Sequence, residues 1–185
     1  MKHLFLILSA LVITAISLQA QHHDLKVNVG GMLAKTPGLY YEFSSDPYNG
    51  FGAGINHTWF NLRVDGEKYS FKNTTFVSDY RRYFIPSEEG GADRLFAGAY
   101  FKAGGGHVSG GAETEEMARY GKVAVGATVG WKLVSEGGFI FEFYTGGGKN
   151  FLTHASVKDT NLNKALNAVS WFDFRFGLTL GYRFL

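Results

Sequence analysis

The sequence predicts an all-β fold, an eight-stranded antiparallel up-and-down transmembrane β-barrel with a polar lumen filled by side chains. The clearest observation is the alternation of residues 171–185 between two faces. Apolar residues of this segment are Phe172, Phe174, Phe176, Leu178, Leu180, Tyr182 and Phe184, and the alternating residues are Asp173, Arg175, Gly177, Thr179, Gly181 and Arg183. A period of two indicates a strand between an apolar and a polar medium. Lipid outside and a narrow polar lumen inside satisfy both faces.

The composition is the second observation. The chain contains 25 glycines, 16% aromatic residues and only 3 prolines, and few prolines suit long strand ladders because each proline removes a backbone donor. Without cysteine the chain forms no disulfide and carries no N-terminal lipid on a cysteine. A net charge of +2 without a basic block argues against nucleic acid as a partner. We expect no cofactor.

The N-terminus is the third observation, because it has the three regions of a secretory signal peptide. Met1-Lys2-His3 is basic, Leu4 to Leu18 is apolar or small, and Gln19-Ala20-Gln21 offers a cleavage point. A retained anchor is the alternative, but the apolar run is shorter than the ~20 residues that span a bilayer. We therefore expect a signal peptide at residues 1–20 and one barrel domain at residues 21–185.

Period-two segments and turn signals predict eight strands. Their expected bounds are Leu25–Leu33, Gly38–Ser45, Phe51–Leu62, Thr74–Ile85, Arg94–Val108, Tyr120–Val134, Phe139–Asn150 and Ser170–Phe184.

The predicted connections differ between the two ends of the barrel. Asp46–Gly50, Pro86–Asp93 and Glu136–Gly138 are compact, whereas Val64–Asn73, Ser109–Arg119 and Phe151–Val169 are longer, with Ala34–Pro37 the short exception among them. Short turns at one rim and longer loops at the other are typical of bacterial outer-membrane barrels. Both chain ends would then lie on the periplasmic side.

Alternation within each strand predicts which side chains face the lumen. The expected lumen charge network comprises Lys26, Glu42, Asp79, Arg81, Lys102, Lys132, Glu142, Asp173 and Arg175. Eight strands leave room only for side chains, so we expect an ion-paired plug and no open pore. The expected aromatic girdle at the membrane interfaces comprises Trp59, Phe84, Trp131, Trp171, Tyr182 and Phe184.

One register follows from these facings. If Glu136–Gly138 is a hairpin loop, Ser135 pairs with Phe139 and Lys132 opposes Glu142 inside the barrel. Both faces are then consistent, which a slip of one residue would destroy. We expect Lys132 and Glu142 to form an ion pair.

A soluble lipocalin-like barrel is the alternative fold, but there the apolar face points inward. The glycines here share a face with the charges. They are Gly52, Gly54, Gly98, Gly126, Gly130, Gly177 and Gly181. Glycine weakens a solvent-exposed strand, whereas in a small lumen it makes room for long side chains, which favours the membrane barrel.

Four segments carry a resemblance to a known group. They are Lys26-Val27-Asn28, Tyr40-Tyr41-Glu42, Tyr80-Arg81-Arg82-Tyr83-Phe84 and Gly177 to Phe184. The chain resembles the small eight-stranded outer-membrane β-barrels of the OmpA/OmpX-like superfamily, especially uncharacterised members from Bacteroidota. The resemblance implies the outer membrane of a Gram-negative bacterium, contact with its lipid and lipopolysaccharide, and a monomer. It also implies insertion by the barrel-assembly machinery, which reads a terminal aromatic residue; here Phe184 is followed by Leu185.

For function we expect a structural or surface-interaction protein, with specificity for an unnamed extracellular ligand in the loops Ser109–Arg119 and Phe151–Val169. The enzymatic alternative is a lipid A deacylase-like hydrolase. His107 and Ser109 resemble the His/Ser pair of outer-membrane lipid A deacylases, and an acidic residue such as Glu113, Glu115 or Glu116 would orient the histidine.

Metal binding has two weaker candidates, the segment His22-His23-Asp24 and the acidic loop from Glu113 to Glu116. A disordered periplasmic stub and a solvated loop explain them more simply. We expect no metal site.

Overall fold

The computed structural model describes residues 22–64, 67–88, 91–110, 116–157 and 171–184. The predicted signal peptide and Glu113 lie outside these ranges.

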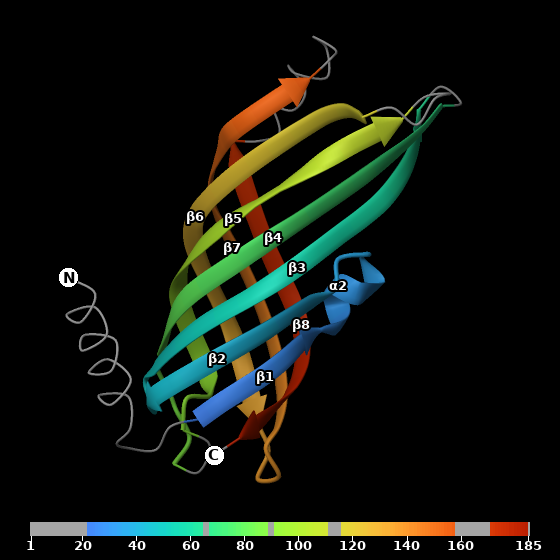
Figure 1. Cartoon of the computed structure of the whole chain (residues 1–185). Helices are drawn as coiled ribbons and strands as arrows, with labels where there is room; N and C mark the ends of the chain where they lie inside the picture. The colour runs from blue at the N-terminus through green and yellow to red at the C-terminus, as the bar shows by residue number, and fades with distance from the viewer. Residues whose placement is uncertain (1–21, 65–66, 89–90, 111–115, 158–170, 185) are drawn as a thin grey trace, which may run out of the picture.

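Eight antiparallel strands close into a barrel in chain order, with β1 paired to β8 (Figure 1). Their bounds are β1 His22–Asn28, β2 Gly38–Asp46, β3 Asn49–Val64, β4 Glu67–Tyr83, β5 Arg94–Gly110, β6 Glu116–Val134, β7 Phe139–Val157 and β8 Phe172–Phe184. The predicted all-β, eight-stranded architecture is confirmed.

The predicted first strand was too long, because a one-turn helix, α2 (Val29–Leu33), follows β1. The Asn28 side chain accepts a hydrogen bond of 2.8 Å from the Gly31 backbone N–H, which is the usual way to cap a helix N-terminus. Gly30 and Gly31 weaken a strand at this point. Val29 therefore begins a helix instead of facing outward from a strand. Within the described ranges, no helix has the length and apolar character needed to cross a membrane.

Three of the predicted loops were also too long. The strands β3 to β7 contain 16, 17, 17, 19 and 19 residues, so much of Val64–Asn73, Ser109–Arg119 and Phe151–Val169 is strand. Pairing of β3 with β4 continues to Val64 and Glu67.

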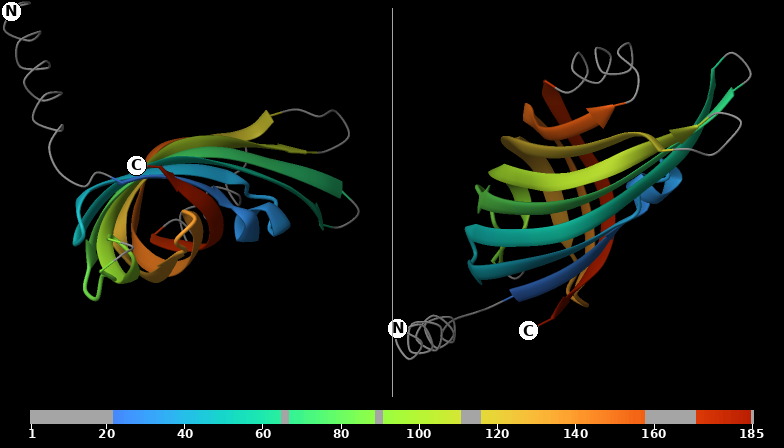
Figure 2. Two further views of the ribbon diagram at one scale, coloured as in Figure 1. Left: turned by 90° about the horizontal axis from the view of Figure 1, so that it is seen from below. Right: turned by 45° about the horizontal axis from the view of Figure 1, so that its top comes forward.

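The strands differ in length around the barrel, so its wall is taller on one side than on the other. The strands β1 and β2 have 7 and 9 residues, whereas about 9–11 residues span a membrane. The strands β3 and β4, with 16 and 17 residues, extend past α2, as both views in Figure 2 show. At the opposite end, β8 ends near the start of β1 and close to the short turns (Figure 1).

The register of β6 and β7 agrees with the prediction. Lys132 pairs with Glu142, and Trp131 pairs with Phe143. The Ser135 N–H donates to the Phe139 carbonyl oxygen at 2.9 Å, as expected for the Glu136–Gly138 hairpin.

The polarity of the barrel is inverted relative to a soluble protein. Fully buried side chains include Lys26, Lys132, Glu42 and Glu142. Apolar side chains on the outside include Leu25, Leu39, Tyr41, Phe51, Ile55, Phe101, Val125, Val129, Leu133, Phe139, Phe141, Phe143, Phe172, Phe174, Phe176, Leu178 and Leu180. This arrangement is the reverse of a lipocalin-like barrel.

Candidate functional site

The centre of the lumen is a buried ion cluster around Glu42 of β2. Its Oε2 atom accepts from Lys26 Nζ at 2.6 Å and Arg81 Nη1 at 2.9 Å. Its Oε1 atom accepts from Lys132 Nζ at 2.7 Å and the Tyr83 hydroxyl at 2.5 Å. Because a carboxylate with four donors is well compensated, its burial is tolerated.

Glu142 of β7 completes the cluster from the other side of the lumen. Its Oε2 atom accepts from Lys26 Nζ at 2.7 Å and Arg81 Nη1 at 2.8 Å. The same two cations therefore bridge Glu42 and Glu142, and side chains from β1, β2, β4 and β7 meet at one point.

The predicted ion pair between Lys132 and Glu142 was wrong, although the two residues are register partners. Lys132 Nζ instead binds Asp24 Oδ2 at 2.8 Å as well as Glu42. In a closed barrel, long inward side chains reach strands across the lumen. A ladder partner is therefore only one of several available counter-ions.

The network continues towards the end of the barrel where β1 begins. Arg183 Nε binds Asp24 Oδ1 at 2.7 Å, and Arg183 Nη2 donates to the Ala92 carbonyl oxygen at 2.9 Å. Ala92 is buried beside Tyr83 and Phe96. The β4–β5 connection thus covers this end of the lumen.

The network also continues in the opposite direction, towards α2. Asp79 Oδ1 accepts from Arg81 Nε at 3.1 Å, and Asp79 Oδ2 accepts from Arg175 Nη2 at 2.6 Å. A separate group joins Asp173 Oδ2 to Lys102 Nζ at 2.7 Å and to the Tyr100 hydroxyl at 2.7 Å. All nine predicted network residues face the lumen and take part in these contacts.

Glycines on the inner face provide the room for these long side chains. A Cβ atom at Gly177 would overlap the Tyr144 ring, and one at Gly52 would overlap the Asp79 carboxylate. The Arg175 guanidinium lies over the Tyr144 ring, with 4.7 Å between Cζ and the ring centroid. Small and large inward residues are therefore complementary across the lumen.

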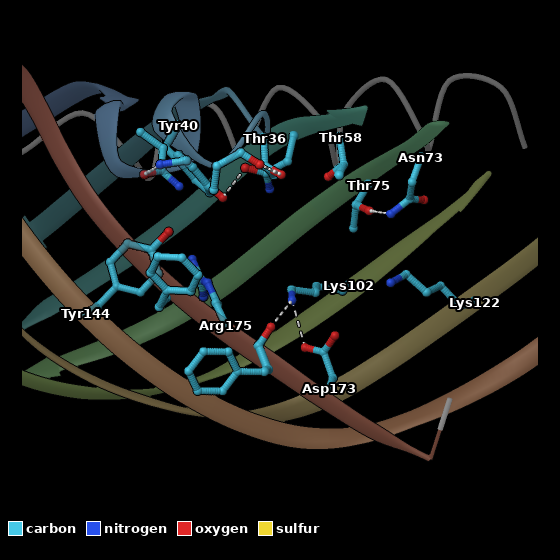
Figure 3. Close-up of a pocket in the computed structure, with 16 residues that line it drawn as sticks. Thr36, Tyr40, Thr58, Asn73, Thr75, Lys102, Lys122, Tyr144, Asp173 and Arg175 are labelled. Carbon is cyan, nitrogen blue, oxygen red and sulfur yellow. Dashed lines mark hydrogen bonds and ion pairs between the residues drawn. The ribbon is translucent and has the colours of Figure 1, made fainter. Parts of the chain in front are cut away.

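A cavity of about 210 Å³ lies at the end of the lumen next to α2 (Figure 3). The cations Lys102, Lys122 and Arg175 line it together with Asp173. Neutral polar groups of Tyr40, Asn56, Thr58, Asn73 and Thr75 also line it.

Three charged residues of the lumen, Asp24, Arg183 and Lys122, were not in the predicted network. Asp24 was grouped with His22 and His23 as a disordered stub, but β1 begins at His22 and Asp24 is buried. Asp24 and Lys26 are two positions apart on β1, so their side chains point to the same face of the strand, and this spacing predicts that Asp24 lies inside. Arg183 is also buried, and Lys122 lines the cavity. Among the described residues, no group of three His, Cys, Asp or Glu side chains has metal-site geometry.

Aromatic girdle residues lie on the outside at two levels. Phe84, Tyr182 and Phe184 lie near the end where β8 ends, and all three are exposed. Trp59 lies beside the α2–β2 connection, where its backbone N–H donates to the Lys35 carbonyl oxygen at 3.0 Å. Trp171 is exposed just before β8, and Trp131, partly exposed, precedes the end of β6.

The enzymatic candidates His107 and Ser109 lie two positions apart near the end of β5. Val108 is buried between them, so His107 and Ser109 project from the other face. A register irregularity follows at Ser109. Within the described part of the chain, no hydrogen bond joins His107 to Ser109, and Glu113 is outside it. The described geometry therefore does not assemble a triad.

Comparisons with known proteins give one distant similarity. No protein-family model and no curated protein matches the chain. The crystal structure of CarO2 from Acinetobacter baumannii is similar over 89% of this chain and 97% of that chain, with 13% identity and a TM-score of 0.46. Membership of the OmpA/OmpX-like superfamily and a Bacteroidota origin stay predictions. The function is therefore inferred from the geometry of the barrel.

Proposed function

We propose that this chain is an integral β-barrel of the outer membrane of a Gram-negative bacterium, with a structural or surface-interaction role and no catalytic activity. The observation that carries the proposal is the inverted polarity of the barrel. Lys26 and Glu42 are each 1% exposed inside, whereas Phe174 and Phe176 are 60% and 53% exposed outside.

An apolar belt around a closed barrel is unfavourable in water and favourable in lipid. Soluble monomers rarely expose continuous apolar patches larger than a few hundred Å², and here such side chains surround the ring. Closure also pairs the backbone groups of every strand with a neighbour, as a hydrocarbon environment requires. Both features support insertion in a membrane.

The lumen supports a barrel that does not conduct ions. Ion pairs from Arg183 through Asp24, Lys132 and Glu42 to Arg81 cross the interior. An open path would require several of these buried pairs to separate, and breaking one typically costs about 3–5 kcal/mol.

The extended hairpins support a surface role. With the end where β1 begins on the periplasmic side, the β3–β4 and β5–β6 hairpins extend outside the cell. Strand segments that extend beyond a rigid scaffold are where binding residues usually lie. We propose lipopolysaccharide as the neighbouring lipid and an extracellular ligand for these hairpins.

Biogenesis follows from the same assignment. The signal at residues 1–20 would direct export, and the barrel-assembly machinery would recognise β8, whose last aromatic residue is Phe184. The expected product is a monomer, because strand closure is complete within one chain.

Expression of the full chain in a Gram-negative host tests this proposal. We expect the mature protein in the outer-membrane fraction, with faster gel migration when unheated than after boiling. A protein recovered from the soluble periplasm, with migration independent of heating, would contradict the proposal.

A further inference from the structure

The cavity at the α2 end of the lumen lies where positive charge exceeds negative charge. Among the described strand residues facing the lumen, the cations are Lys26, Arg81, Lys102, Lys122, Lys132, Arg175 and Arg183, and the carboxylates are Asp24, Glu42, Asp79, Glu142 and Asp173. The cations farther from the cavity, Lys26, Arg81, Lys132 and Arg183, all contact carboxylates. The excess of positive charge therefore lies on the side chains that line the cavity.

Arg175 is the buried anchor of this charge. Its side chain is 3% exposed, and among the described residues only its Nη2 atom donates a hydrogen bond, to Asp79. Its Nε and Nη1 atoms are buried without a hydrogen-bond partner among the described residues. A buried guanidinium with two unused donors is costly, and its planar fork matches an oxyanion.

Lys122 adds a cation that has no carboxylate partner among the described residues. Lys102 pairs with Ala124 and Gly104 pairs with Lys122, so Lys102 and Lys122 are diagonal neighbours on one face, within reach of each other. Asp173 neutralises Lys102 at 2.7 Å, but no carboxylate contacts Lys122 within the described ranges. Figure 3 shows both lysines extending into the cavity.

We propose that this cavity binds a small oxyanion, the phosphate or carboxylate group of a small solute, through Arg175, Lys122 and Lys102. The Asn56 amide oxygen accepts from the Tyr40 hydroxyl at 2.7 Å, which leaves the Asn56 amide nitrogen as a further donor. The size of the cavity sets the ligand class. About 210 Å³ exceeds one water at ~30 Å³ but lies below the ~300–1,000 Å³ of drug-sized sites.

Titration calorimetry on the full mature chain folded in detergent tests the site, with inorganic phosphate and succinate as separate probes at constant chloride. We expect saturable binding of at least one probe. Phosphate alone indicates a tetrahedral oxyanion, and succinate alone indicates a carboxylate. Absence of saturable binding of both would overturn the proposal.

A matched pair of lysine variants locates the binding. Lys122→Gln removes an unpaired charge from the cavity, whereas Lys149→Gln removes one from the exposed outer face, where Lys149 lies over Trp171. We expect Lys122→Gln to weaken binding about tenfold and Lys149→Gln to leave it unchanged. Heat-dependent gel migration checks that both variants are folded. Equal affinities in the wild type and Lys122→Gln would overturn the assignment.

Discussion

Lys132 and Glu142 are direct register partners on β6 and β7, yet each binds its counter-ions on other strands. Lys132 Nζ binds Asp24 and Glu42, while Glu142 Oε2 binds Lys26 and Arg81. The charges of the lumen are therefore organised across the barrel, and they join strands that are not neighbours in the sheet.

Glu42 is expected to be the most sensitive position of this network. Glu42→Gln keeps the shape but removes the charge that compensates Lys26, Arg81 and Lys132. We expect the free energy of unfolding to fall by about 3–5 kcal/mol, measured by urea titration in detergent micelles. The control Glu136→Gln, in the exposed β6–β7 turn, should unfold like the wild type. Equal urea midpoints for Glu42→Gln and the wild type would rule out a structural role for the cluster.

Gly177 is expected to be coupled to Tyr144. Gly177→Ala places a methyl group against the Tyr144 ring, and overpacking of this kind costs about 1–3 kcal/mol. In a Tyr144→Ala background the same substitution should cost much less, so a double-mutant cycle measures the contact. Gly137→Ala is the matched control, because the nearest atoms to its Cβ are 3.9 Å away. Additive effects of the Gly177 and Tyr144 substitutions would show that the two residues are not in contact.

Ion conduction is expected to be negligible. Planar-bilayer recordings of the purified wild type should show no stable conductance steps, since buried ion pairs fill the middle of the lumen. Large and stable steps in most insertions would show that the network does not close the barrel.

Hydrolysis of lipid A is not expected. Cells that express the chain should keep the acylation pattern of their lipid A, and His107→Ala should give the same pattern. Mass spectrometry of extracted lipid A provides the measurement. A loss of acyl chains that depends on His107 would establish the deacylase-like alternative.

Alternation alone could predict much of this architecture, because a strand between two media repeats with period two. It predicts the inward facing of Asp79 and Arg81 and the register of Lys132 with Glu142. It could not give the partners of these charges, which depend on which side chains meet across a closed lumen. It also could not separate strand from loop where both faces become polar, so β4 was expected to begin at Thr74 and begins at Glu67.

The central claim, that the aromatic outer face contacts lipid, is tested most directly through the tryptophans. Trp59, Trp131 and Trp171 are the 3 tryptophans of the chain, and all of them lie on the outer side of the barrel. After folding into vesicles, their fluorescence should be strongly quenched when the acyl chains are brominated. Emission that is the same in brominated and ordinary lipid would contradict the account.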